Sequence, residues 1–143
     1  MKTINLLLFV MVFLAAGLVQ TQAQENKSKD GVYEKVEIMP EYPGGEMALQ
    51  NDLVANIKYP EEAKKAGIQG KVYVSFVVDE QGKVTEAKIE RGVEPSLDKE
   101  SLRVINKLKT WKPGKDKGKI VKVAYTVPIN YALDSKTDQK EKK

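Results

Sequence analysis

The sequence contains neither cysteine nor histidine, and both absences restrict what the protein does. Without cysteine no disulfide can cross-link the chain, so we expect about a hundred ordered residues whose hydrophobic core alone stabilises the fold. Without histidine the chain lacks the usual general base, the usual proton shuttle and the commonest metal ligand. No serine has a histidine partner and no metal-ligand cluster is present, so we expect no enzyme, no cofactor and no metal site.

A strong charge imbalance is also missing. The chain has 24 basic and 20 acidic side chains, and a net charge of +4 is too small to indicate nucleic-acid binding. The basic residues do gather near the C-terminus, with only Asp116 among them: Lys109, Lys112, Lys115, Lys117, Lys119 and Lys122. We interpret this stretch as a solvated basic loop, with attraction to anionic lipid, peptidoglycan or an acidic receptor surface as the alternative.

The N-terminus has the layout of a secretory signal peptide. Lys2 precedes an apolar run from Ile4 to Val19, and Thr21-Gln22-Ala23 supplies a small-x-small cleavage site. The run is shorter than the twenty or so residues that a spanning helix needs. We therefore predict cleavage after residue 23, with an uncleaved anchor in the inner membrane as the alternative.

The remaining chain divides into three parts. Residues 24–38 are polar and predict a flexible lead-in, although weak alternation from Val32 to Ile38 would allow a short strand. Residues 39–133 carry the apolar patterns of a folded domain, and the charged residues 134–143 predict a disordered tail.

Helical and strand periods alternate within this domain. A helix begins near Glu46, and Pro60 then opens a short second helix. The first helix is expected to turn one face inward: Met47, Leu49, Leu53, Val54 and Ile57. A hairpin follows, with its turn at Asp79–Gly82 and a bulge near Thr85–Glu86 in the return strand. Asp98 is the expected N-cap of the next helix, after which Trp111 is expected to enter the core.

The last strand, Val121–Tyr131, is the most informative element. Its odd-numbered residues are all apolar, whereas its even-numbered residues are mixed and include Pro128. Because proline has no N–H to give to a ladder, it favours an edge strand, and a long edge offers unpaired backbone groups to an extended peptide. The strand is therefore the candidate surface of a binding module. The alternative is an edge strand that binds no partner and is kept soluble by Lys122 and Pro128.

An ordered set of motifs resembles the C-terminal domain of the TonB energy transducer. The resemblance covers residues 36–133, and a Tyr42-Pro43-Gly44-Gly45 leader is similar to that of the Bacteroidetes-type versions. The motifs are Tyr59-Pro60, Ala63, Gly67-Ile68-Gln69-Gly70-Lys71-Val72, Asp79, Gly82-Lys83-Val84, Trp111-Lys112-Pro113-Gly114 and Val127-Pro128-Ile129-Asn130-Tyr131.

The resemblance implies an α+β fold in which two helices pack on a small three-stranded antiparallel sheet, with an extra N-terminal helix segment. It also implies that the last strand binds the TonB box, an extended segment of TonB-dependent outer-membrane receptors, by strand addition. The implied partner-binding residues are Val123, Ala124, Tyr125, Thr126, Val127, Pro128, Ile129, Asn130 and Tyr131, with Tyr59 and Pro60 beside the docked receptor. From the residues alone, Tyr59-Pro60 is instead a helix break in which Tyr59 covers the core.

The chain departs from the full transducer in two respects. It has no recognisable proline-rich rod, and its N-terminal apolar run has no histidine or acidic group for work with the proton-driven inner-membrane complex. We therefore expect a periplasmic module that grips receptors, and either modulates or assembles with a full transducer. The alternative is an envelope protein that binds peptidoglycan through its basic loop, or forms a homodimer through its edge strand.

Overall fold

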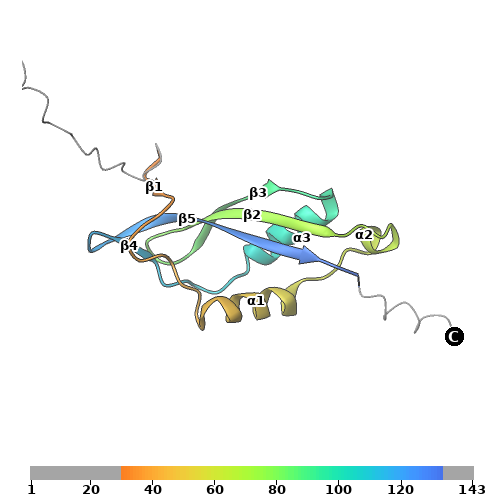
Figure 1. The fold of residues 1–143 in the computed structure, drawn as a ribbon, viewed down its shortest axis with the longest axis horizontal. Coiled ribbons are helices and arrows are strands. Elements are labelled where there is room, and N and C mark those ends of the chain that lie inside the picture. The colour runs from red at the N-terminus through yellow and green to blue at the C-terminus, as the bar shows by residue number, and fades with distance from the viewer. Residues whose placement is uncertain (1–29, 134–143) are drawn as a thin grey trace, which may run out of the picture.

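The computed structural model describes residues 30–133, so the predicted signal peptide (1–23) and tail (134–143) lie outside the described residues. Figure 1 shows a sheet with β1 and the β4–β5 hairpin at one end of the molecule and α2 at the other. The elements in chain order are β1 (Val32–Tyr33), α1 (Gly45–Asn56), α2 (Glu61–Lys65), β2 (Gly70–Val78), β3 (Val84–Arg91), α3 (Pro95–Ile105), β4 (Gly114–Asp116) and β5 (Lys119–Tyr131).

The centre of the sheet is antiparallel, as predicted. β2 lies between β3 and β5 and pairs with each of them in antiparallel orientation. Two short strands extend this three-stranded sheet: β1 pairs with β5 in parallel, and β4 pairs with β5 as a hairpin. The predicted α+β class is confirmed, and the described strands number five rather than three.

The two additional strands change how two segments are interpreted. The described part of the predicted lead-in, residues 30–38, contains β1 and an isolated bridge between Ile38 and Lys115. The stretch interpreted as a basic loop is a hairpin, whose two turn residues Lys117 and Gly118 both have positive φ, 49° and 76°. Such a two-residue turn matches the twist of the flanking strands. It was missed because β4 is three residues long and shows no alternation.

The inward face predicted for α1 is wrong in part. Leu49 and Leu53 are buried, but Met47 and Val54 are 74% and 75% exposed. An α-helix turns about 100° per residue, so Met47 lies roughly 200° from Leu49 and cannot share its face. The helix therefore contacts the core through a narrow stripe, and two large apolar side chains remain in solvent.

The predicted N-cap of the helix after the hairpin is also wrong. The cap of α3 is Glu94, whose carboxylate accepts hydrogen bonds from the backbone N–H groups of Ser96 and Leu97 at 3.0 and 3.3 Å. Pro95 follows at the first helical position, where its missing N–H is harmless. Asp98 lies one turn later and accepts a hydrogen bond from the backbone of Val93 at 3.0 Å.

The hairpin of β2 and β3 agrees with the sequence pattern. Gly82 closes its turn at φ 79°, and the pairing slips between Ser75 and Val77, where Glu86 has φ 52°. This slip is the bulge predicted near Thr85–Glu86. A second slip follows between Tyr73 and Val74, so β3 is an irregular strand.

Trp111 lies at the centre of an aromatic cluster in the core, as predicted. Its ring contacts those of Tyr42, Phe76 and Tyr125, with centroid separations of 5.3, 5.6 and 5.0 Å. Its backbone N–H donates to the carbonyl of Gly82 at 2.7 Å, which joins the chain after α3 to the hairpin turn. The buried core residues all lie between Val36 and Tyr131, within the described chain.

Gly82→Ala is predicted to destabilise the domain by about 3 kcal/mol. A Cβ at this position would lie 1.8 Å from the carbonyl oxygen of Trp111, and the positive φ adds strain. Urea unfolding followed by Trp111 fluorescence measures the change. Gly118→Ala is the matched control, because its φ is +76° but nothing lies within 4 Å of the added carbon, so only about 1 kcal/mol is expected. Equal effects of the two changes would contradict the packing of Gly82 against Trp111.

Two buried serines are predicted to respond oppositely to alanine. The Ser101 hydroxyl donates to the Leu97 carbonyl at 2.7 Å and lies 2.9 Å from the Tyr131 hydroxyl. Ser75 is 9% exposed, and its hydroxyl has no partner within residues 30–133. Ser101→Ala should therefore lower the free energy of unfolding by about 1 kcal/mol, whereas Ser75→Ala should leave it unchanged or raise it. Calorimetry of both variants tests this, and a stability loss in Ser75→Ala would contradict it.

Candidate functional site

The side chains of β5 divide by parity between the core and the open face of the sheet. The inward set is buried or half-buried: Val123, Tyr125, Val127, Ile129 and Tyr131. The outward set lies in solvent, except for the half-buried Ala124: Thr126, Pro128 and Asn130. All nine residues were predicted to bind a partner. Because the inward side chains are committed to the core, they can contribute only their backbone to such binding.

One edge of β5 is partly covered by β1. β5 pairs with β2 through nine successive residue pairs, from Val123 to Tyr131, without a register shift. On its other side β1 reaches only Lys122 and Val123. Among the described residues, no strand pairs with that side from Ala124 to Tyr131. We call this stretch the outer edge of β5. The sequence did not predict that β1 would pair with Lys122 and Val123, just before this edge, because a two-residue strand leaves no period to detect.

Pro128 indicates which backbone groups point outward. Along a strand, successive N–H and C=O groups point alternately to the two neighbouring strands. Proline lacks an N–H and is tolerated in a sheet where that position faces solvent. Since the pairing with β2 continues through Pro128 unbroken, we infer that the backbone groups of Pro128 point away from β2. Ala124, Thr126 and Asn130 are separated from Pro128 by even numbers of residues along the strand, so their N–H groups point to the same side.

Among residues 30–133, β3 forms the other edge of the sheet, and it is poorly suited to pairing. Two register shifts interrupt β3, and Glu86 at the first shift is left-handed. Exposed charged side chains lie along the strand at Glu86, Lys88, Glu90 and Arg91. Bulges and charges are the features that block strand addition at sheet edges. The outer edge of β5 is the regular one of the two.

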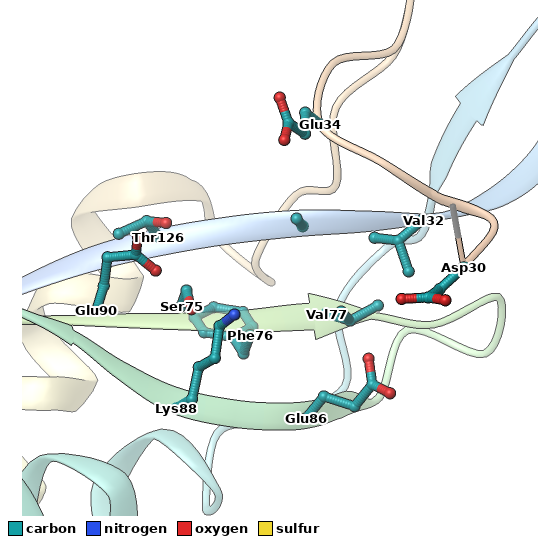
Figure 2. A pocket seen from close by; sticks show the side chains of 11 residues that line it. Asp30, Val32, Glu34, Ser75, Phe76, Val77, Glu86, Lys88, Glu90 and Thr126 are labelled. Atoms are coloured by element: carbon teal, nitrogen blue, oxygen red, sulfur yellow. The ribbon is translucent and has the colours of Figure 1, made fainter. Parts of the chain in front are cut away.

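A shallow hollow of about 800 Å³ lies on the open face of the sheet, beside the outer edge. Figure 2 shows Ser75 and Val77 of β2 at its floor, with Lys88 of β3 extending over the sheet and Asp30 and Glu34 approaching from the β1 side. Ala124 and Thr126 form its border on β5. Side chains that an added strand projected onto this face would therefore meet the hollow. Of its lining residues, only Ala124 and Thr126 were predicted to bind a partner, since the lining comes from four separate segments.

Tyr59 and Pro60 lie at the C-terminal end of β5. The Tyr59 ring packs edge-on against Tyr131 at a centroid distance of 5.5 Å, and its hydroxyl donates to the Ile68 carbonyl. Burial raises the pKa of this hydroxyl. Pro60 is the N-cap residue of α2. The structure thus brings both residues to one end of the candidate strand, and gives Tyr59 a structural role in covering the core.

These two residues also line a second hollow of about 640 Å³, between the α1–α2 connection and the start of α3. Glu100 fixes that connection, because it accepts a hydrogen bond from the Lys58 backbone at 2.9 Å and another from the Nε of Arg103 at 2.8 Å. The hydrogen bond from Arg103 is the main reason why the pKa of Glu100 is lowered. Arg103 in turn donates to the Asn56 carbonyl at 2.8 Å, so the end of α1 is held to α3.

Within residues 30–133 no group of three or more acidic, histidine or cysteine side chains is placed to hold a metal ion. None of the helices in this range is long and apolar enough to cross a membrane.

Amide hydrogen exchange on residues 24–143 is predicted to alternate along β5. The N–H groups of Tyr125, Val127 and Ile129 should exchange slowly, because they face β2. Those of Thr126 and Asn130 should exchange at least tenfold faster, because they face solvent on the outer edge. Exchange followed by two-dimensional NMR measures each amide separately. Uniform protection of all five would show that the outer edge is covered or that the parity is reversed.

Comparison with known proteins gives a family match. The family model for the Gram-negative bacterial TonB protein C-terminal matches residues 55–133, more than half of the chain, while no curated protein matches. The TonB C-terminal domain of Helicobacter pylori is 27% identical, with a TM-score of 0.48 over 62% of this chain and 79% of that one.

Two further solved structures are similar. The TonB C-terminal domain of Pseudomonas aeruginosa is 24% identical, with a TM-score of 0.43, and covers 54% of this chain and 78% of its own. The HasB C-terminal domain is 24% identical, with a TM-score of 0.39, over 64% and 71%. The Bacteroidetes-type subtype stays a prediction. The family match over residues 55–133 shows that the chain belongs to the TonB C-terminal domain family.

Proposed function

We propose that this protein is a periplasmic module that binds the TonB box of TonB-dependent outer-membrane receptors by strand addition to β5. The observation that carries the proposal is the regular outer edge from Ala124 to Tyr131, unpaired within residues 30–133. Family membership supports it, because TonB C-terminal domains are transport and interaction domains. Export and the periplasmic location rest on the signal peptide predicted for residues 1–23.

The backbone of β5 supplies the affinity. An added strand would meet the N–H groups of Thr126 and Asn130, together with the carbonyls of the outward-facing residues from Ala124 to Asn130. Each backbone hydrogen bond contributes roughly 1 kcal/mol net. Because association and ordering of the peptide oppose these bonds, we expect weak binding, with a Kd on the order of 1 mM. β1 already occupies the position beside Val123, so the partner strand is limited to the stretch beyond it.

Selectivity comes from the side chains on the open face. Ala124 and Thr126 leave space for the partner's side chains, and the hollow beside them carries the carboxylates of Asp30 and Glu34 at its β1 end. Tyr59 and Pro60 would lie beside the docked receptor at the opposite end of β5. Energy coupling would come from a full transducer and its proton-driven inner-membrane complex, which this module modulates or joins.

Titration of isotopically labelled residues 24–143 with a TonB-box peptide tests the proposal. Up to millimolar peptide, the amide signals of Ala124–Tyr131 should shift, with the largest changes on the outward parity. Signals of the irregular β3 edge should stay in place. A titration that leaves Ala124–Tyr131 unshifted at millimolar peptide would exclude binding at this site.

Two substitutions at one position separate the backbone from the side chain. Thr126→Pro removes an N–H that we infer to face outward, and should weaken peptide binding about tenfold while β2 and β5 stay paired. Thr126→Ala keeps that N–H and should change binding less than threefold. If both variants bind equally well, strand addition at Thr126 is wrong. Sedimentation velocity distinguishes the homodimer alternative, in which the free protein already uses this edge for a second copy.

A further inference from the structure

The hollow beside Ala124 and Thr126, on the open face of the sheet, has an excess of negative charge. Four carboxylates and one ammonium group line it: Asp30, Glu34, Glu86, Glu90 and Lys88. Figure 2 shows Lys88 between Glu86 and Glu90 along β3, with Asp30 on the side from which β1 approaches. The chain as a whole carries a net charge of +4, so the hollow departs from the rest of the protein.

Neighbouring groups do not cancel this charge. An adjoining hollow, near the turn between β2 and β3, adds Asp79, Glu80 and a single cation, Lys122, so the two hollows together hold six acidic and two basic side chains. The remaining basic residues of β2 and β3 lie toward the α2 end of these strands and line neither hollow: Lys71 and Arg91. Within residues 30–133 no ion pair neutralises any of the six carboxylates.

A buried hydroxyl without a partner lies at the floor of the first hollow. Ser75 is 9% exposed, and its Oγ makes no hydrogen bond within residues 30–133. Ser75 pairs with Lys88 on β3 and with Thr126 on β5, so the three side chains form one row on the open face. Buried hydroxyls in proteins are normally hydrogen-bonded. The Ser75 hydroxyl can therefore accept from a donor that enters the hollow and moves the long Lys88 side chain aside.

The shape of this hollow suits a long cationic side chain. Its carboxylates are spread around it, and within residues 30–133 no three acidic groups lie close enough together to hold a metal ion. The half-buried Val32 and the buried Val77 add apolar surface. Lysine and arginine lay their methylene groups along apolar surface while the charged end stays in polar surroundings.

We propose that the strand added to β5 carries a lysine or arginine whose side chain enters this hollow. This placement rests on the proposed strand addition, and it defines the chemistry that the partner must bring. A residue paired with Thr126 projects from the same face of the sheet as Thr126, which borders the hollow. Glu34 follows β1 and lines the hollow on the side where the added strand lies. The partner's cation would then lie among the carboxylates and donate to Ser75.

A series of peptides tests the inference on residues 24–143. An uncharged TonB-box peptide receives one arginine at each position in turn, and matched peptides carry glutamine or glutamate there. At the position paired with Thr126, arginine should bind about tenfold tighter than glutamine, and glutamate should bind more weakly than either. The gain should vanish at both neighbouring positions, because their side chains point to the other face, and it should shrink as salt rises. Two-dimensional NMR measures each Kd and reports whether the signals of Ala124–Tyr131 shift.

Substitutions in the hollow should change the arginine preference, which is the Kd of the glutamine peptide divided by that of the arginine peptide. Asp30→Asn with Glu34→Gln should lower this ratio from about tenfold to below threefold, because two of the carboxylates lose their charge. Ser75→Ala should lower the ratio about threefold through loss of the acceptor. Lys88→Gln removes the hollow's own cation and should raise the ratio about threefold.

The matched control is Glu41→Gln with Glu46→Gln. It removes two exposed carboxylates outside the hollow and should leave the arginine preference unchanged. Circular dichroism confirms that every variant is folded.

The possible failures are distinguishable. Equal binding of the arginine and glutamine peptides, with shifts at Ala124–Tyr131, would overturn this inference and leave strand addition intact. A preference that appears at every position, or that Asp30→Asn with Glu34→Gln leaves at full strength, would show that the cation lies outside the hollow. Unshifted signals of Ala124–Tyr131 with every peptide would overturn the proposed function, and this inference with it.

Discussion

The unbroken pairing of β5 with β2 is the constraint on which the rest of the structure depends. Nine successive residue pairs fix the register, so every second side chain of β5 must enter the core. Tyr125 then meets Trp111, and Tyr131 meets Ser101 of α3 and Tyr59 before α2. A slip of one residue would move this whole set to solvent, so the cost of a wrong register is the loss of the core itself. The same pairing leaves the opposite backbone groups of β5 for a partner.

The two ends and two edges of the sheet differ in what they offer. The β3 edge is interrupted and charged, whereas the β5 edge is regular and bears Pro128 where no donor is required. β1 pairs only with Lys122 and Val123, just before this edge begins. A surface that binds through its backbone requires no side chain with special chemistry, and the chain has neither histidine nor cysteine.

The features that could be predicted from the sequence either repeat along the chain or follow from the backbone conformations that a single residue allows. The alternation of β5, the turn glycine Gly82 and the bulge beside Glu86 were each visible locally, and Trp111 was identified as core. Features formed by contact between distant segments were not visible. The hollow at Ser75 and the pairing of β1 with Lys122 have no local signal. The burial of α1 was mispredicted because apolar residues were counted without their helical angles, which place Met47 opposite Leu49. The N-cap of α3 was mispredicted because Asp98 was chosen by residue type alone. The carboxylate that lies in position to accept from the first N–H groups of the helix is that of Glu94.

The central claim is that a partner adds as a strand along the outer edge of β5, and cysteine cross-linking tests it most directly. The natural chain has no cysteine, so each single substitution is the only thiol in the protein. Cysteines at Ala124, Thr126 and Asn130 would be combined with cysteines placed along a TonB-box segment, with Lys64→Cys on α2 as the control. Strand addition predicts disulfides in a fixed register: moving the cysteine by two residues along β5 should move the preferred cysteine position on the segment by two residues. The control cysteine at position 64 should form no disulfide with the segment. Cross-links without this register, or equal cross-linking from α2, would contradict the account.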